Sequence, residues 1–294
     1  MSALRILVVG DLVTDVLVTR AGAVVPGSDT EAEIRIGGGG QAANTAAWLA
    51  HAGVAATLIA AAGDDLAGQQ RVAELNAAGV DCAVRHHPGA ATGSIVVLSS
   101  AGDRTMITDR GAALLLDPVD VQQAVKAAPQ SVHLHLSGYP LLHAGSRPGG
   151  LAALAAARER GLTTSVDAAS AGPLRAVGDF LELVRGVDVL LCNADEAEVL
   201  AGPGSAGEQA GVLRTYAKNV VVKRGAHGAV WRSSDGRLYS SAAVRVPSID
   251  ATGAGDAFAA GLLAAWLGGK GPEAALRAGA EMGAAAVRKI GARP

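Results

Sequence analysis

The stretch DATGAGDAFAAG, residues 250–261, places two carboxylates around a glycine turn just before an apolar helical pattern. The first N–H groups of a helix have no partner inside the helix, and the helix dipole adds partial positive charge there. Gly253, Ala254 and Gly255 have almost no side chain, so phosphate oxygens can approach this backbone closely. Asp256 stands where it can accept a proton from an attacking hydroxyl. The stretch therefore predicts either a phosphoryl-transfer site or a helix start that its acidic residue stabilises.

The composition is that of a folded protein with a large core. Of 294 residues, 50% are hydrophobic and 18% charged, and a formal net charge of −2 gives no footprint for nucleic acid or an anionic membrane. The sequence has no apolar run of the roughly 18 residues that span a membrane, and its start lacks the pattern of a secretory signal. Two cysteines fit a reducing compartment. We expect a cytoplasmic protein that binds neither nucleic acid nor membrane.

Short apolar runs alternate with helical patterns along most of the chain. Runs such as LRILVVG (4–10) and AATLIAAAG (55–63) are typical of buried strands. Their alternation with helices predicts an α/β fold with a doubly wound, mostly parallel sheet. Residues 15–36 and 92–110 instead look like half-exposed antiparallel strands, the second of them a hairpin, and we expect them to form a small β-lid. The α/β core that binds nucleotide and substrate would then comprise residues 1–14, 37–91 and 111–294.

The segment DATGAGDAFAAG resembles the C-terminal signature of the ribokinase (PfkB) family of sugar and nucleoside kinases, D-T-x-G-A-G-D-x-F-x-x-G. Ala251 stands where threonine is common. Further stretches resemble family motifs in family order: GDLVTD (10–15), GGQAANTAAWLAHAG (39–53), NADE (193–196) and VVVKRGAHGA (220–229). The resemblance spans nearly the whole chain. It implies a ribokinase-like fold and an enzyme that transfers the γ-phosphoryl group of ATP to a hydroxymethyl group of a small sugar or sugar acid, with a nucleoside as the alternative acceptor.

Carried over position by position, the resemblance implies which residues form the site. The catalytic base is Asp256, beside an anion hole formed by Gly253, Ala254 and Gly255. Contacts with the acceptor are expected from Asp11, Asp15, Gly39, Gly40, Asn44, Arg104 and Arg110. Contacts with the nucleotide are expected from Asn193, Glu196, Lys223, Gly225 and Gly228. Each residue also has a purely structural interpretation, as a cap, a turn residue, a buried asparagine or a solvated arginine.

Two cation sites follow from the same resemblance. Asn193 and Glu196 lie three residues apart at a helix start, hence on one face, and would reach Mg²⁺ through water. Asp250 and Thr252 match positions that bind a monovalent cation, usually K⁺, with the C-terminal KIGARP closing the site. Asp167 ends a buried strand at the same sheet edge without an assigned role.

The acceptor stays open between several classes. Val13 stands two residues before Asp15, where ribokinases usually have asparagine, and GDLVTD is closer to the G-E-x-x-x-D start of fructokinases and 2-keto-3-deoxygluconate kinases. Nucleoside kinases of the pseudouridine or adenosine type also fit. A lid with an open sheet edge favours a homodimer through the lid.

Two further classes compete with the kinase interpretation. GGGQAA (38–43) satisfies the G-x-G-x-x-A pattern of an NAD-dependent oxidoreductase, but that pattern needs a buried strand before its first glycine. EAEIRI (31–36) carries three charged residues on one face and is a poor buried strand. The second class is a non-catalytic sugar or nucleotide sensor on the same fold, and the presence of Asp256 and its glycine turn argues against it.

Overall fold

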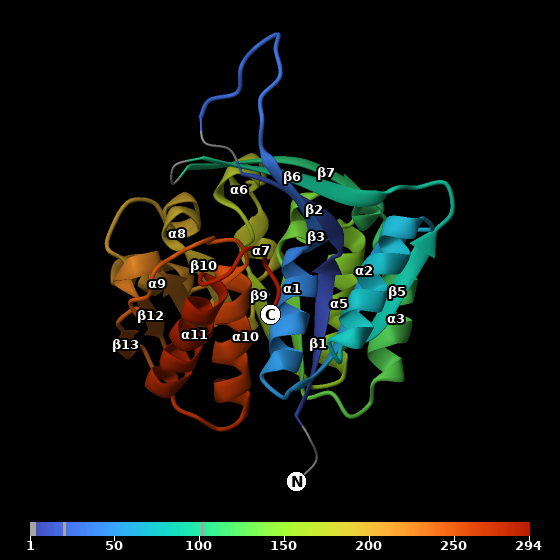
Figure 1. The fold of residues 1–294 in the computed structure, drawn as a ribbon. Helices are drawn as coiled ribbons and strands as arrows, with labels where there is room; N and C mark the ends of the chain where they lie inside the picture. Colours follow the sequence, from blue (N-terminus) through green and yellow to red (C-terminus); the bar gives the residue numbers. More distant parts are fainter. Residues whose placement is uncertain (1–3, 20–21, 101–102) are drawn as a thin grey trace.

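The computed structural model describes residues 4–19, 22–100 and 103–294, and two sheets organise this part of the chain (Figure 1). The larger has the strand order β13-β12-β11-β10-β9-β8-β1-β4-β5, and the smaller has the order β3-β2-β6-β7. The strands are β1 (Arg5–Asp11), β2 (Val13–Thr19), β3 (Glu33–Gly39), β4 (Ala55–Gly63), β5 (Asp81–His87), β6 (Thr92–Ser100), β7 (Asp103–Gly111), β8 (His133–Ser137), β9 (Thr163–Asp167), β10 (Val187–Asn193), β11 (Ala217–Lys223), β12 (Ala229–Arg232) and β13 (Leu238–Ser241).

Helices cover both faces of the larger sheet, with α1, α2, α10 and α11 on one face and α3, α5, α8 and α9 on the other. In the described part of the chain, no helix combines the length and the apolar character that crossing a bilayer requires. The helices are α1 (Gln41–His51), α2 (Leu66–Ala77), η1 (Ala112–Leu115), α3 (Pro118–Ala127), α4 (Tyr139–Leu142), α5 (Arg147–Glu159), α6 (Ala171–Ala176), α7 (Phe180–Leu183), α8 (Ala194–Ala201), α9 (Ala206–Leu213), η2 (Gly225–His227), α10 (Ala254–Leu267) and α11 (Pro272–Ala286).

Strand β1 has apolar side chains on both faces because the larger sheet is buried between helices. Ile6 and Val8 belong to the apolar cluster that contains Trp48 of α1. Leu7 and Val9 point the other way and join the cluster on the opposite face. A continuous apolar run is what a strand covered on both sides requires. The predicted doubly wound α/β fold is therefore confirmed.

The order of the larger sheet reverses between β1 and β8. From β1 the chain moves outward to β4 and β5, and from β8 it moves outward in the other direction to β11, with parallel pairing throughout. Ligands of open α/β sheets bind outside the carboxyl ends of the strands at such a reversal. Asp11 and Ser137 end the two strands there. The smaller sheet lies across this same edge (Figure 1).

The smaller sheet forms the predicted lid from two antiparallel hairpin pairs, β2 with β3 and β6 with β7. Strands β2 and β6, which join the pairs, run parallel, so the expectation of a wholly antiparallel lid is wrong at this junction. Because β3 belongs to this half-exposed sheet, no buried parallel strand feeds the 38–43 glycines, and the dinucleotide-binding interpretation is wrong.

Candidate active site

The turn before α10 is built around Gly253, whose φ of 75° lies in the left-handed region. A Cβ on this residue would lie 2.4 Å from the carbonyl oxygen of Ala292, so glycine is required by both conformation and space. The same oxygen accepts a hydrogen bond of 2.9 Å from Trp48 Nε1. The C-terminal segment therefore fixes the turn against α1. The N–H of Ala254 donates to Ala251 over 3.3 Å.

Asp256 lies in the first turn of α10, and its half-buried carboxylate accepts a hydrogen bond of 2.9 Å from Asn44 Nδ2. Burial raises the pKa of Asp256 well above its usual range, and the carboxylates of Asp167 and Asp11 add to the effect. The Asn44 amide and the ammonium group of Lys223 oppose it. A raised pKa makes this carboxylate a stronger proton acceptor, as a general base requires.

Asp15, on β2, is 4% exposed and lies directly against the glycines that end β3. A Cβ on Gly39 would come within 2.0 Å of Asp15 Oδ1, so glycine leaves room for this carboxylate. Burial raises the pKa of Asp15 to about 6, against the opposing charge of Arg293. Oδ1 has no hydrogen-bond partner among the described residues. A buried carboxylate oxygen without a partner fits a hydroxyl donor from a ligand.

Asp11 and Arg110, both expected at the acceptor, are bonded to each other. Arg110 Nη1 donates to Asp11 Oδ2 over 3.1 Å, and the guanidinium lies 3.7 Å from the centre of the Tyr139 ring. Asp11 Oδ1 accepts from the N–H of Ala42 and from Ser137 Oγ, each over 3.2 Å. This network ties β7 of the lid to the edge of the larger sheet.

For two other residues expected at the acceptor, Gly40 and Arg104, the structure describes the backbone. Gly40 has a φ of 98°, and a Cβ there would lie 2.4 Å from the backbone oxygen of Asp11, so the start of α1 lies close against the end of β1. Arg104 belongs to strand β7, but its side chain lies outside the described part of the structure.

Lys223 reaches the rim of the α10 turn. Its Nζ would lie 3.5 Å from a Cβ on Gly255, and it donates to Asp167 Oδ2 over 2.5 Å. Burial opposes the charge of Lys223, but Asp167 and Glu196 outweigh burial and raise its pKa. Asp167 therefore gains a role that the sequence did not assign, because it holds an ammonium group beside the helix start. Gln41 Nε2 donates to Asp167 Oδ1 over 3.0 Å.

Asn193 and Glu196 form a capping box at the start of α8. The N–H of Glu196 donates to Asn193 Oδ1 over 2.9 Å, and the N–H of Asn193 donates back to Glu196 Oε2 over 2.8 Å. Glu196 Oε1 accepts from Asn193 Nδ2 over 2.7 Å. Burial raises the pKa of Glu196 to about 7. The predicted common face is present, and the two side chains also satisfy the cap.

Asp250 joins the loop before α10 to the C-terminal segment. Its Oδ1 accepts from both the N–H and the Oγ1 of Thr252, over 2.8 and 2.6 Å, and its Oδ2 accepts from the N–H of Gly291 over 3.0 Å. The loop and the C-terminal segment, which were expected to close a cation site together, are therefore held side by side.

The two glycines between β11 and β12 differ in their surroundings. A Cβ on Gly228 would come within 2.0 Å of the Ser241 carbonyl oxygen, so this glycine is required by the fold of the turn. A Cβ on Gly225 would meet nothing within 4 Å in the described structure. Of these two glycines, Gly225 is therefore the one with free space beside its backbone.

Several residues near this edge were not singled out from the sequence. Ser137 Oγ lies 2.7 Å from Gln41 Oε1 and 3.2 Å from Asp11 Oδ1, so its one proton is shared between two acceptors. Arg293 donates to Asn44 Oδ1 over 3.3 Å. A usable signal existed for Gln41, which lies within the GGQAAN motif, and for Ser137, which ends a buried strand. Arg293 lies within the C-terminal KIGARP, but nothing in that stretch predicted its contact with Asn44, 249 residues away along the chain.

A family model described as "pfkB family carbohydrate kinase" matches residues 3–294. The chain belongs to this family, so the resemblance expected from its motifs is confirmed. It is a kinase of the sugar and nucleoside type, a phosphotransferase whose acceptor is an alcohol group.

Two relatives and two solved structures indicate the range within the family. The chain is 33% identical over 278 residues to an ATP-dependent ribose-1-phosphate kinase of Halopiger xanaduensis, covering 92% of this chain and 88% of the relative. It is 32% identical over 251 residues to a 2-dehydro-3-deoxygluconokinase of Thermoproteus tenax, covering 81% and 75%. The solved structure of a probable sugar kinase from Rhizobium etli matches with a TM-score of 0.89 and 24% sequence identity. The structure of adenosine kinase from Sinorhizobium meliloti matches with a TM-score of 0.86 and 23% identity. Each match covers 100% of this chain and 96% of the other chain. These structures share its fold.

Proposed function

We propose that this chain transfers the γ-phosphoryl group of ATP to a hydroxymethyl group of a small sugar or sugar derivative. The observation that carries the proposal is the pair of hydrogen bonds of the Asn44 side chain, which donates to the half-buried Asp256 at the α10 turn and accepts from Arg293. Arg293 in turn donates to the carbonyl oxygen of Gly39, the glycine that lies against Asp15. On this proposal, Asp256 is the base, the start of α10 binds the phosphoryl group, and the unpartnered oxygen of Asp15 accepts a hydroxyl of the acceptor. An acceptor that presents hydroxyls to Asp15 would have its reacting hydroxyl at Asp256.

In the reaction, Asp256 takes the proton of the attacking hydroxyl as the new oxygen–phosphorus bond forms. The start of α10, with Gly253, Ala254 and Gly255, and the ammonium of Lys223 stabilise the charge on the transferring group. The lid covers the site and excludes water, which would otherwise compete as the acceptor. The nucleotide would lie along Gly225, on the same side as Lys223.

Asn193 and Glu196 fit a Mg²⁺ ion that is held mainly by water and phosphate oxygens. The described residues contain no group of three or more His, Cys, Asp or Glu side chains able to hold a metal. A buried carboxyl whose pKa is about 7 offers one strong acceptor for a metal-bound water. When bound, Mg²⁺ neutralises charge on the phosphates.

A monovalent cation, K⁺, is proposed between the loop of Asp250 and Thr252 and the C-terminal segment. The support is the bond from Gly291 to Asp250, which holds the two segments together beside the α10 turn. A cation there would stabilise the turn that binds the phosphoryl group.

We also propose that the chain forms a homodimer through the lid, because the outer face of the lid has many exposed apolar side chains. This face has apolar side chains from four neighbouring strands, with the polar Ser94, Thr105 and Asp109 toward β7: the apolar residues are Val16, Val18, Ile34, Ile36, Val96, Leu98 and Ile107. Ile34 is 61% exposed and Ile36 70%. An apolar face of this extent is typical of a surface that another chain covers.

Incubation with ATP, Mg²⁺ and a panel of sugars, sugar acids, sugar phosphates and nucleosides, with and without K⁺, tests the proposal. We expect the wild type to form ADP and a phosphorylated sugar derivative. Asp256→Asn should lose this activity, and Glu273→Gln should retain it. Glu273 is a matched control, since it is an acidic residue in the first turn of the next helix, α11. Phosphorylation confined to nucleosides would favour the nucleoside alternative, and phosphorylation of none of the panel would contradict the proposal.

A further inference from the structure

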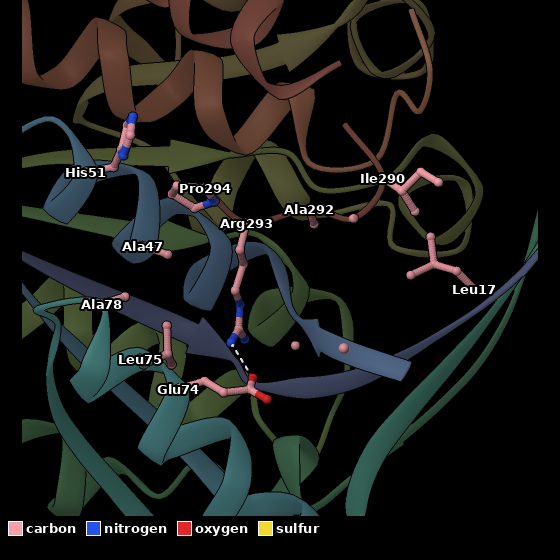
Figure 2. Close-up of a pocket in the computed structure, with 13 residues that line it drawn as sticks. Leu17, Ala47, His51, Glu74, Leu75, Ala78, Ile290, Ala292, Arg293 and Pro294 are labelled. Atoms are coloured by element: carbon pink, nitrogen blue, oxygen red, sulfur yellow. Dashed lines mark hydrogen bonds and ion pairs between the residues drawn. The ribbon is translucent and has the colours of Figure 1, made fainter. Parts of the chain in front are cut away.

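A cavity of about 540 Å³ lies between α1, α2, the end of β3 and the C-terminal segment. Figure 2 shows Arg293 reaching through its middle toward Glu74. The Arg293 side chain is 14% exposed, and its guanidinium donates to the Gly39 carbonyl oxygen over 3.0 Å and to Asn44 Oδ1 over 3.3 Å. A Cβ on Gly38 would lie 2.0 Å from Nη1, so this glycine makes room for the guanidinium.

A second buried arginine belongs to the same group. Arg71 of α2 is 5% exposed and lies one turn before Leu75, which lines the cavity, so both are on the same side of the helix. Its Nη2 donates to Glu74 Oε1 over 2.6 Å, while Nε and Nη1 have no hydrogen-bond partner among the described residues. Arg293 Nη1 lies 3.4 Å from the other oxygen of Glu74. Two buried guanidinium groups therefore share one half-exposed carboxylate.

Two buried guanidinium groups, one of them with N–H donors that no described residue accepts, destabilise the fold unless a further group accepts their hydrogen bonds. A buried donor left without a partner loses its hydration, and a buried charge loses more. Asp15 is the other carboxylate close enough to affect the pKa of Arg293, yet its own Oδ1 is unpartnered. The region thus contains unsatisfied donors on Arg71 and an unsatisfied acceptor on Asp15. A ligand with both hydroxyls and anionic oxygens would satisfy both kinds.

Arg293, which lines the cavity, links it to the expected acceptor residues through its hydrogen bond to Asn44. The Asn44 amide donates to Asp256 at one end and accepts from Arg293 at the other, over 2.9 and 3.3 Å. One asparagine amide therefore separates the base from the guanidinium, a span that a pentose or hexose derivative covers. Gly37 lines the cavity, and a Cβ there would meet nothing within 4 Å in the described structure.

We propose that this cavity binds an anionic group of the acceptor, a carboxylate or a phosphate, through the guanidinium of Arg293, with Arg71 supplying further N–H donors. A guanidinium presents paired donors that match both groups. The proposal rests on the proposed kinase function and narrows it, because the acceptor would be a sugar acid or a sugar phosphate in preference to a neutral sugar. Named activities of the two relatives above, on ribose-1-phosphate and on 2-dehydro-3-deoxygluconate, agree with this chemistry.

Steady-state kinetics test the proposal with ribose-1-phosphate and 2-dehydro-3-deoxygluconate against neutral ribose and fructose. We expect at least one anionic acceptor to be preferred, and Arg293→Gln to raise its KM about 10- to 100-fold, as loss of a charged hydrogen bond predicts. KM for a neutral sugar should change less than about threefold. Arg293→Lys keeps the positive charge without the paired donors, so its KM for the anionic acceptor should lie between those of the wild type and Arg293→Gln. Arg288→Gln, an exposed arginine of the same segment, should leave all values unchanged.

Calorimetric titration without nucleotide separates this proposal from the kinase function. The wild type should bind the preferred anionic acceptor, with inorganic phosphate competing for it, and Arg293→Gln should lose that binding even if no phosphorylation is measured. Preference for neutral sugars, equal losses for neutral and anionic acceptors, or unchanged anion binding in Arg293→Gln would overturn the proposal. Phosphate that activates turnover of neutral sugars without competing with the acceptor would also overturn it, by assigning the cavity to a free anion.

Discussion

Replacement of Asp256 by asparagine should separate the proposed catalytic role of this residue from its effect on stability. The carboxylate accepts one hydrogen bond, from Asn44 Nδ2, and an asparagine oxygen at the same place can still accept it. The variant loses only the negative charge and the ability to take a proton. Because burial raises the pKa of Asp256 well above its usual range, the ionised form costs the folded state free energy at neutral pH. The neutral variant should therefore be as stable as the wild type or more stable.

Loss of a general base typically lowers turnover by about 10²- to 10⁴-fold, equivalent to about 3 to 5 kcal/mol of activation free energy. We expect kcat to fall by this factor at saturating acceptor, with Tm unchanged or higher. A coupled assay of ADP release gives kcat, and thermal unfolding followed by circular dichroism gives Tm. Glu273→Gln should change neither. A folded Asp256→Asn enzyme with kcat within tenfold of the wild type would contradict the role of Asp256 as the base, and so would a loss of activity that follows a lowered Tm.

Three further predictions concern other parts of the structure. Gly253→Ala should destabilise the fold by at least about 1–3 kcal/mol and lower Tm by several degrees, because alanine at a positive φ would also overlap the Ala292 oxygen; an unchanged Tm would contradict this. Asp15, whose pKa burial raises to about 6, binds more protons when folded, so its contribution to stability should fall as pH rises from about 4 to 6. The acceptor KM should rise as pH falls below about 6, and both trends should weaken in Asp15→Asn; identical pH profiles in wild type and variant would exclude this role. Ile36→Lys should convert a dimer into a monomer in light scattering without loss of fold, whereas a monomeric wild type would remove the dimer proposal.

The sequence predicted those features that depend on local pattern. Continuous apolar runs such as β1 and β4 identified the doubly wound sheet, and the glycine turn at 253–255 identified the start of α10. Strand β5 was missed because it lies at the sheet edge, where its alternating exposure gives no apolar run. The parallel pairing of β2 with β6 was missed because it depends on how two distant hairpins meet.

Side-chain partnerships in the site could not be predicted from the sequence. Lys223 was expected at the nucleotide, but its partner Asp167 is 56 residues away. Arg110 was expected at the acceptor, and its ion pair with Asp11 depends on where the lid meets β1. The contact between Arg293 and Asn44 spans 249 residues. Motifs place a residue at the correct edge of the sheet, while the fold decides which neighbour it meets.

In the proposed mechanism, the start of α10 holds the phosphoryl group while Asp256 receives the proton of the acceptor. A crystal structure with a non-hydrolysable ATP analogue, Mg²⁺ and the preferred acceptor tests it most directly. We expect the terminal phosphate within hydrogen-bonding distance of the Gly255 N–H and of Lys223 Nζ, with the acceptor hydroxyl on Asp256. A terminal phosphate bound away from this turn, with Asp256 still paired only to Asn44, would contradict it.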